Sequence, residues 1–335
     1  MRLSMPASRR TMIKATSAIA LGQLGLAPTA SAAEPWKDSK LPIRIVVPFP
    51  PGGYTDVVAR LIANNLRPLL NRSVIVDNKA GANGILGTTE VARAAPDGNT
   101  LLLIGPGHIT NALLRHKISY DPAKDFQPIL KVGVFPNVLV VPNKSPYKNV
   151  KDLIAAAKVK AEGVSYASAG LGSSNHLSME LLQHYAGVKL RHIPYKGSGA
   201  AELDVMGGHI DSMFSGAPSA IPNAKQGSFR AIAVSGSQRL DTMPTVPTIA
   251  EAGVPDYQHV TWLGFYAPAN TPGDVVSALN AAANKVMQTP ELVQRMHDLG
   301  AENYRPHSAA EFRQFLVKET EEQTKLLSSA KVEKE

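Results

Sequence analysis

Short apolar segments alternate with amphipathic segments along almost the whole chain. Apolar runs rich in Val, Ile and Leu predict strands at 43–48, 73–77, 100–105, 129–141, 163–167, 190–194, 210–215, 230–235 and 260–267. Apolar residues spaced three and four apart predict helices at 55–67, 84–95, 150–160, 174–186, 199–206, 218–226, 273–287, 290–298 and 308–328. Strands that alternate with helices are typical of βαβ units, so we expect an α/β protein with parallel sheets.

Two of the predicted strands are long and lie far apart in the sequence, at 129–141 and 260–267. A chain of this length usually divides its core over two domains, and these strands would pass near the junction. The prediction is a first lobe made of residues 33–138 plus 251–335 and a second lobe made of residues 139–250. The hinge would lie near 139–141 and 235–262.

The segment 43–62 has the most specific pattern. An apolar strand, Ile43–Val47, enters a Pro- and Gly-rich loop, Pro48–Gly53, and Thr55 or Asp56 then starts a helix. The first turn of a helix offers free N–H groups and a partial positive charge, which suit an anion. The candidate ligand contacts here are Phe49, Pro51, Gly52, Gly53, Tyr54, Thr55 and Asp56.

The same segment also fits an ordinary strand-to-helix turn. The loop lacks the GK[ST] ending of a phosphate-binding P-loop, which argues against nucleotide binding.

Four more loops repeat this order of strand, small residues and helix. The loop at 166–176 is the most similar to the first, and those at 105–111, 81–87 and 195–199 follow it. Ligands of open α/β sheets lie at the carboxyl ends of strands, so two such loops in different halves predict a shared cleft. Capping of the helix alone would explain the same serines. The candidate contacts are Ser168, Ala169, Gly170, Gly172, Ser173 and Ser174, with Gly107 and His108 from the loop at 105–111.

The sequence gives little support for a metal site or for catalysis. His176, Glu180 and His184 share one helix face, but ligands spaced down two turns do not converge on one ion, so no metal site is expected. The chain has no G-x-S-x-G motif and no recognisable acid–base pair, so no catalytic residue and no cofactor is predicted. Trp262, near the junction, could stack on a solute or pack in the core.

The N-terminal segment has the three parts of an export signal. Ser8–Lys14 contains a twin-arginine pattern, an apolar run spans residues 15–27, and Ala30–Ala32 provides small residues for cleavage before Ala33. The general export route also fits this segment, because its signals need only a basic start and not a twin-arginine pattern. Removal of its four basic residues lowers the formal net charge from +8 to +4. No basic run of nucleic-acid type remains.

The absence of cysteine excludes disulfides and thiol chemistry. The export signal predicts a periplasmic location.

Eight segments in order resemble the signatures of the extracytoplasmic receptors of tripartite tricarboxylate transporters, called the TctC or Bug family. They are RIVVPFPPGGYTD (44–56), AAPDGNTLLL (94–103), YDPAKDFQPI (120–129), PNVLVV (136–141), YASAGLGSSNHL (166–177), HIPYKGSGAA (192–201), MPTVPTIAEAG (243–253) and WLGFYAPANTP (262–272). The resemblance implies a type II periplasmic-binding-protein fold, in which two α/β lobes close over one solute. It also implies a small carboxylate ligand held by backbone amides and hydroxyls, membrane permease subunits as partners, and a monomer.

Two residues depart from the family pattern. Tyr54 stands where the family usually has Ser or Thr, and would line the cleft mouth and favour a flat or aromatic acid. Ser215 stands where many members have Asp, which removes a partner for an ammonium group and predicts a ligand without one.

The predicted function is an extracytoplasmic receptor that captures a di- or tricarboxylate or an aromatic acid for such a transporter, not an enzyme. A periplasmic receptor for a signalling kinase is one alternative, and an exported cofactor-free hydrolase is another.

Overall fold

The computed structural model describes residue 36, residues 39–159, 161–302 and 304–329, and residues 332 and 334. The predicted export signal and its cleavage site lie outside the described residues. Residues 36–335 form one compact unit. Within the described residues, no helix is long and apolar enough to cross a membrane.

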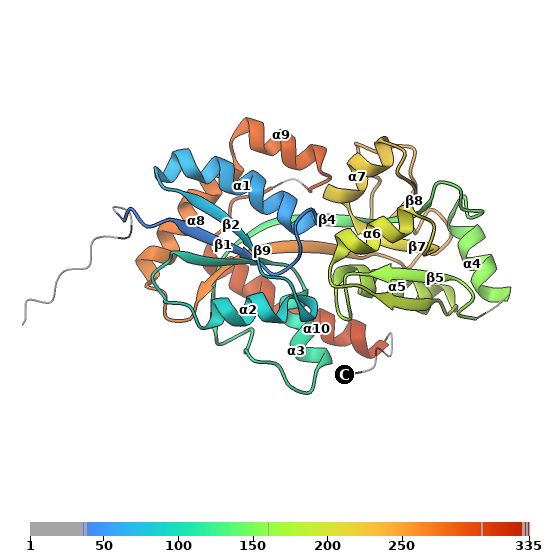
Figure 1. The fold of residues 1–335 in the computed structure, drawn as a ribbon, viewed down its shortest axis with the longest axis horizontal. Helices are drawn as coiled ribbons and strands as arrows, with labels where there is room; N and C mark the ends of the chain where they lie inside the picture. The colour runs from blue at the N-terminus through green and yellow to red at the C-terminus, as the bar shows by residue number, and fades with distance from the viewer. Residues whose placement is uncertain are drawn as a thin grey trace, which may run out of the picture. The chain divides into compact units, whose positions relative to one another are not determined.

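One long strand, β4 (Phe126–Pro142), belongs to two sheets (Figure 1). Its first part pairs antiparallel with β9 (Val260–Pro268). The first sheet has the order β2-β1-β3-β9-β4, and β1 is parallel to both of its neighbours. The remaining strands of this sheet are β1 (Ile43–Val47), β2 (Val74–Asn78) and β3 (Thr100–Ile104). Val46 and Val47 are fully buried, as expected where helices cover both faces of a sheet.

The second part of β4 pairs antiparallel with β7 and β8 in the second sheet. On the other side of β7 the order continues through β5 to β6, with parallel pairs. The strands are β5 (Ser165–Ser168), β6 (Arg191–Pro194), β7 (Ser212–Gly216) and β8 (Phe229–Val234). Each sheet with the helices that pack on it is called a lobe here, the first lobe being that of β1.

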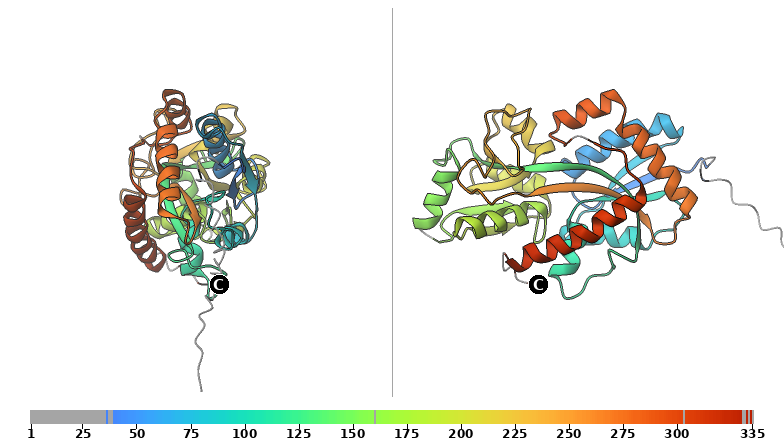
Figure 2. Two further views of the ribbon diagram at one scale, coloured as in Figure 1. Left: turned by 90° about the vertical axis from the view of Figure 1, so that its left-hand side faces the viewer. Right: turned by 180° about the vertical axis from the view of Figure 1, so that it is seen from behind.

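The helices cover the faces of the two sheets. Those of the first lobe are α1 (Tyr54–Leu70), α2 (Ile85–Ala92), α3 (Gly107–Leu114), α8 (Gly273–Met287), α9 (Pro290–Asp298) and α10 (Ala309–Ser329), with the short 3-10 helix η2 (Ala82–Gly84). Those of the second lobe are α4 (Val150–Val159), α5 (Ser174–Ala186), α6 (Ser198–Met206) and α7 (Ala217–Lys225). Seen from behind, α10 runs obliquely past β4 (Figure 2), and Leu327 near its end joins Leu114 of α3 and Leu177 of α5 in one buried cluster.

Every predicted strand and helix is present, and the predicted two-lobed α/β fold is confirmed. The expectation of parallel sheets is only half right, because β4 and β9 run antiparallel to their neighbours. An amphipathic helix between two strands favours a parallel pair but does not require one. The helix α3 was missed, because a segment that begins with Pro106 and Gly107 resembles a loop.

Where the chain crosses between the lobes, a small hydrogen-bonded cluster joins β4 to Ser235 and His259. Asn137 N donates to Ser235 Oγ over 2.7 Å, and Ser235 N donates to Asn137 O over 2.8 Å. Ser235 Oγ in turn donates to the carbonyl of His259, just before β9. These contacts lie close to the predicted hinge segments. The predicted residue boundaries of the lobes stay a prediction.

Three histidines, His108, His176 and His259, are buried, and His192 is half-buried. Burial lowers the pKa of His108, His192 and His259 to about 4. Burial, and then the neighbouring His192, lowers the pKa of His176 to about 3. Each folded pKa lies below the ordinary value of 6.5, so the unfolded chain binds these protons more tightly. The stability that depends on the neutral rings is therefore present above pH 6.5 and is lost as the pH falls toward 4.

We predict that the free energy of unfolding falls steadily between pH 6.5 and pH 5.0. Each unit of pH below 6.5 removes up to about 1.4 kcal/mol per buried histidine. Urea unfolding followed by circular dichroism at pH 7.5, 6.5, 5.5 and 5.0 measures this slope. His108→Gln should flatten it. An unfolding midpoint that stays constant from pH 7.5 to 5.0 would contradict the prediction.

Candidate functional site

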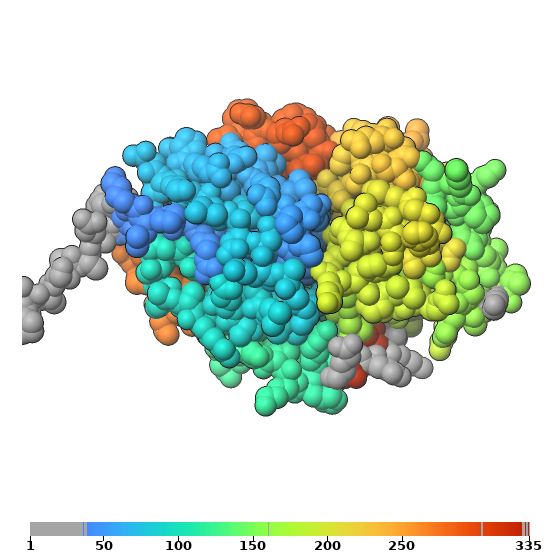
Figure 3. All heavy atoms as spheres, in the orientation of Figure 1, coloured from blue at the N-terminus to red at the C-terminus, as the bar shows by residue number. Residues whose placement is uncertain are grey.

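A small cavity of about 20 Å³ lies where the two lobes meet. One water molecule needs about this much room. The space-filling view shows that the chain around α1 (blue) and that around α6 (yellow) touch along this face (Figure 3). The residues that line the cavity are Phe49, Gly53, Tyr54, Thr55, Asn83, Gly107, Ala169, Ser173, Ser174 and Ser198.

Four helices begin at this cavity. Tyr54 starts α1, Gly107 starts α3, Ser174 starts α5 and Ser198 starts α6. The N-terminal end of a helix carries a partial positive charge and unpaired N–H groups. Only α5 has a side-chain cap, from Ser173. Since no charged side chain lines the cavity, the helix ends dominate its electrostatics and favour an anion.

Asp56 holds the first loop in shape from within α1. Its carboxylate is buried and accepts hydrogen bonds from Gly52 N and Arg60 Nε, each 3.0 Å long, and from Asn78 Nδ2. Burial alone would raise the pKa of Asp56, but these hydrogen bonds outweigh it and hold the pKa below its ordinary value. The side chain therefore stabilises the loop and is not one of those lining the cavity.

Two hydrogen bonds cross from the first lobe to the glycine-rich loop at 166–176, which is called the second loop here. Asn83 Nδ2 donates to Leu171 O over 2.7 Å, and Thr110 Oγ1 donates to Gly172 O over 2.6 Å. Asn83 adopts a left-handed conformation with φ of 49°, which Asn tolerates better than most residues. Its Oδ1 is buried and has no hydrogen-bond partner among the described residues. That oxygen could accept a hydrogen bond from a ligand hydroxyl.

The second loop is supported from behind by buried rings. Ser168 Oγ lies 2.6 Å from His192 Nε2 and accepts a hydrogen bond from Gly170 N. The His192 ring stacks on Tyr166 at 4.8 Å and lies 4.5 Å from the His176 ring. Ser168 is fully buried and does not line the cavity, so this serine–histidine contact shapes the loop and is not placed to attack a bound solute.

Eight of the predicted contacts line the cavity: Phe49, Gly53, Tyr54, Thr55, Gly107, Ala169, Ser173 and Ser174. Nine do not: Pro51, Gly52, Asp56, His108, Ser168, Gly170, Gly172, Ser215 and Trp262. The ring of His108 packs among Tyr120, Phe126 and Tyr266, and that of Trp262 packs against Phe312 and Phe315. Ser215 Oγ donates to the buried carboxylate of Glu202 over 2.6 Å. Ligand contacts by these nine residues stay predictions.

Two lining residues, Asn83 and Ser198, were missed as site residues. Both belong to loops at 81–87 and 195–199 that the sequence pattern singles out. All five such loops supply at least one residue to the cavity. The pattern of a strand, small residues and a helix could therefore have identified both Asn83 and Ser198 as site residues.

The position of Tyr54 at the cleft mouth stays a prediction. Its ring lies against Gly216 at the end of β7, and its hydroxyl lies near Gly105, which follows β3. These strands pair with β4 and β9. The ring therefore lies between the two lobes, and the residue as a whole is half-buried.

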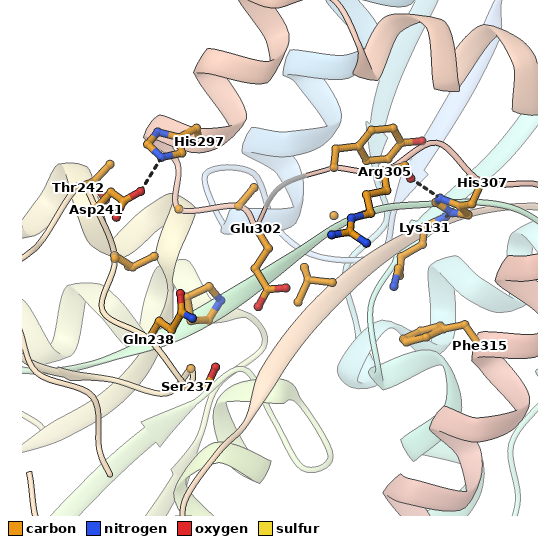
Figure 4. Close-up of a pocket in the computed structure, with 18 of the residues that line it drawn as sticks. Lys131, Ser237, Gln238, Asp241, Thr242, His297, Glu302, Arg305, His307 and Phe315 are labelled. Carbon is orange, nitrogen blue, oxygen red and sulfur yellow. Dashed lines mark hydrogen bonds and ion pairs between the residues drawn. The ribbon is translucent and has the colours of Figure 1, made fainter. Parts of the chain in front are cut away.

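A larger groove of about 830 Å³ borders strand β4 elsewhere (Figure 4). Its walls include residues 236–242 of the second lobe and residues 300–302 and 304–307 of the first. Figure 4 shows the ion pair that joins them, between His297 Nε2 and Asp241 Oδ2 at 3.1 Å. Side chains of both charges, such as Lys131 and Glu302, line the groove, so it favours neither sign of ligand. The cleft cavity is the better candidate although it is smaller.

The described part of the chain holds no group of three or more His, Asp or Glu residues that could bind a metal ion. Of the three residues that share a face of α5, His176 is buried, whereas His184 is exposed. His176 Nε2 lies 3.8 Å from Glu180 Oε1.

A family model described as the tripartite tricarboxylate transporter family receptor (TctC) matches residues 58–331. The UPF0065 protein in the tcbD-tcbE intergenic region of Pseudomonas sp. (strain P51) is 40% identical over 260 residues, which cover 77% of each chain. Protein BugT of Bordetella pertussis is 37% identical over 262 residues, which cover 78% of this chain and 80% of BugT.

Solved structures of similar sequence have the same fold. Rpa4515 of R. palustris with adipate has a TM-score of 0.85 at 33% identity, covering 88% of this chain and 98% of that one. The periplasmic binding protein BugD has a TM-score of 0.84 at 35% identity, with 88% and 99% covered. MatC of Rhodopseudomonas palustris with bound malate has a TM-score of 0.81 at 32% identity, with 85% and 98% covered.

We predict that Asp56→Ala destabilises the fold by about 1.5–3 kcal/mol, because it removes a buried carboxylate that accepts hydrogen bonds from Gly52 N, Arg60 Nε and Asn78 Nδ2. Urea unfolding at pH 7 measures the change. Asp274→Asn is the matched control, since Asp274 also lies in the first turn of a helix but is exposed, and it should cost less than about 0.5 kcal/mol. Equal effects of the two substitutions would show that Asp56 does not hold the loop.

Proposed function

Since the chain belongs to the TctC family of tripartite tricarboxylate transporter receptors, we propose that it captures a small carboxylate between its lobes and delivers it to membrane permease subunits. Members of this family are periplasmic solute-binding proteins, so the chain is a receptor and not an enzyme, as the sequence predicts. Its N-terminal segment is proposed to direct export to the periplasm, with cleavage near Ala32 and Ala33.

The observation that carries the carboxylate assignment is the meeting of four helix starts at a cavity without acidic side chains. Backbone N–H groups at these ends can donate to carboxylate oxygens. The similar structures with adipate and with malate support a carboxylate ligand. The proposed contacts are the ten cavity-lining residues, which include eight of the sequence-predicted ones.

The size of the cavity implies a conformational cycle. A four-carbon dicarboxylic acid is much larger than a water molecule, whose share of liquid volume is about 30 Å³. The cavity of about 20 Å³ cannot hold such an acid unless the lobes move apart. The hinge contacts of Asn137 and Ser235 are where this rotation would occur. The ligand would then favour an arrangement in which both lobes contact it and which is wider than the one in this structure.

The proposed ligand lacks an amino group. Ser215 offers no negative charge, and its hydroxyl is engaged by Glu202. Glu202 is itself buried and does not line the cavity. An ammonium group in the cavity would therefore face helix ends of the same sign without a carboxylate to balance it.

A thermal-shift screen of the purified protein tests this function. The panel is citrate, tricarballylate, succinate, glutarate, glutamate, nicotinate, benzoate and terephthalate. An acid at about 100 times its dissociation constant should add about 2.7 kcal/mol of stability. Glutarate should exceed glutamate, which differs mainly by its amino group. If no acid shifts the midpoint after the protein has been unfolded and refolded to remove any carried ligand, the carboxylate assignment is wrong.

We predict that Gly216→Ala weakens the binding of every acid at least tenfold. The added Cβ would lie 2.9 Å from Tyr54 Cγ, so it would displace the Tyr54 ring and with it the start of helix α1 at the cavity. The backbone of Gly216, with φ of −59°, accepts alanine without strain. Isothermal titration calorimetry with the best acid of the screen measures the loss.

The matched control is Gly199→Ala, in the same contact region between the lobes. Its added Cβ would meet Pro51 O at an ordinary 3.9 Å, so affinity should stay within about twofold. Unchanged affinity in Gly216→Ala would mean that the acid does not depend on the position of the Tyr54 ring and of the α1 start.

A further inference from the structure

The side-chain amide of Asn83 has a fixed orientation. Arg115 Nη1 donates to Asn111 Oδ1 over 2.7 Å, so the amide of Asn111 is turned with its oxygen toward Arg115. Asn83 Nδ2 donates to the same Asn111 Oδ1 over 3.1 Å, and Asn111 Nδ2 donates to Asn83 O over 2.9 Å. Turning the Asn83 amide by 180° would bring its oxygen against Asn111 Oδ1. Since all three residues belong to the first lobe, a movement between the lobes leaves this orientation unchanged.

The oxygen of this amide is left without a donor. Asn83 is 8% exposed, and its Oδ1 has no hydrogen-bond partner among the described residues. A buried acceptor without a donor is costly, and most such groups in folded proteins are paired. Asn83 lines the cavity between the lobes, so a molecule bound there lies against this side chain. The unpartnered oxygen therefore points to a ligand that donates a hydrogen bond.

The serines of the cavity can serve a carboxylate, whereas Asn83 Oδ1 cannot. Ser173 Oγ accepts a hydrogen bond from His176 N. Ser174 Oγ accepts one from Asn137 Nδ2. The hydroxyl hydrogen of each serine can then donate to an anion. An ionised carboxylate only accepts hydrogen bonds, and so does an amide oxygen. A ligand that satisfies Asn83 Oδ1 must therefore carry an O–H or N–H group as well as its carboxylate.

The location of Asn83 places this donor close to the carboxylate. A Cβ built on Gly107, at the start of α3, would lie 3.7 Å from Asn83 Nδ2. A Cβ on Gly170, in the second loop before α5, would lie 3.6 Å from Asn83 Cβ. Asn83 therefore borders two of the helix starts that attract an anion. A hydroxyl on the carbon next to a carboxylate stays close to the carboxylate oxygens, whatever the length and direction of the rest of the molecule.

We infer that this receptor selects acids that carry a hydroxyl group on the carbon next to a carboxylate, because Asn83 Oδ1 accepts a hydrogen bond from that hydroxyl. This inference rests on the proposed function and names a narrower class of ligand within it. An ammonium group could also donate to Asn83 Oδ1, but the helix ends disfavour its charge. The helix starts attract the carboxylate of a hydroxy acid and that of the deoxy acid alike, so the hydroxyl alone distinguishes the two.

The test compares pairs of acids that differ by one hydroxyl group: malate with succinate, citrate with tricarballylate, and lactate with propionate. Titration calorimetry measures each affinity, with the better enantiomer of malate and of lactate. In each pair that binds, the wild type should bind the hydroxy acid about tenfold more tightly or better, because the deoxy acid leaves Asn83 Oδ1 unpaired. Asn83→Gly removes the amide, and glycine accepts the φ of 49° at this position. The ratio of the two affinities should then fall to within about twofold.

The matched control is Thr110→Val. Asn83→Gly also removes the hydrogen bond to Leu171 O, which crosses between the lobes. Thr110→Val removes the other such bond, from Thr110 Oγ1 to Gly172 O, and keeps Asn83 Oδ1. Its ratio of hydroxy-acid to deoxy-acid affinity should equal that of the wild type, even where both affinities fall. Equal loss of the ratio in both variants would show that the contact between the lobes, and not Asn83 Oδ1, distinguishes the acids.

The outcomes separate this inference from the proposed function. The inference is wrong, while the carboxylate receptor stands, if the wild type binds both acids of each pair equally, if it binds only other acids of the earlier screen, or if Asn83→Gly keeps the wild-type ratio. If the wild type binds no acid of the pairs or of the earlier screen, the proposed function fails and the inference fails with it. A thermal unfolding midpoint shows whether each variant is folded, and the wild-type ratios test the inference even if Asn83→Gly is not.

Discussion

The partial charges at the starts of four helices are the constraint on which this structure depends. The helices α1, α3, α5 and α6 direct ends of the same sign at one small cavity that no acidic side chain lines. Bringing these ends together is electrostatically unfavourable, and an anion between them reverses the sign of the interaction. An anion bound at this cavity would therefore stabilise the meeting of the four helix starts.

The sheet topology makes this arrangement possible. The parallel strands β1 and β3 of the first sheet, and β5 of the second, each end at a loop that leads into one of these helices. Because β4 belongs to both sheets, the two sets of strand ends face each other across one cleft. The hydrogen bonds between Asn137 and Ser235 join β4 to the end of β8 within the second sheet, and Ser235 Oγ links them to the carbonyl of His259, just before β9. A single strand thus takes part in both lobes.

The sequence predicts the elements better than it predicts how they pair. Hydrophobic periodicity identifies strands such as β4 and β9, but it does not show their direction, so their antiparallel pairing was missed. The five glycine-rich loops were recognisable because each needs small residues before a helix, and all five reach the cavity. What the pattern could not provide is the orientation of single side chains. His108 and Trp262 occupy the expected segments, but their rings point into aromatic clusters, and the depth of Tyr54 depends on Gly216, which comes from the other lobe.

Recognition by helix ends has a consequence for how such a receptor can differ from its relatives. Backbone N–H groups bind a carboxylate whatever the side chains are, so the attraction for an anion survives most substitutions in the loops. Selection among ligands would then come from the side chains that shape the rest of the cavity, such as Asn83, whose Oδ1 has no hydrogen-bond partner among the described residues. The attraction for a charged group and the choice among ligands would therefore be carried by different atoms.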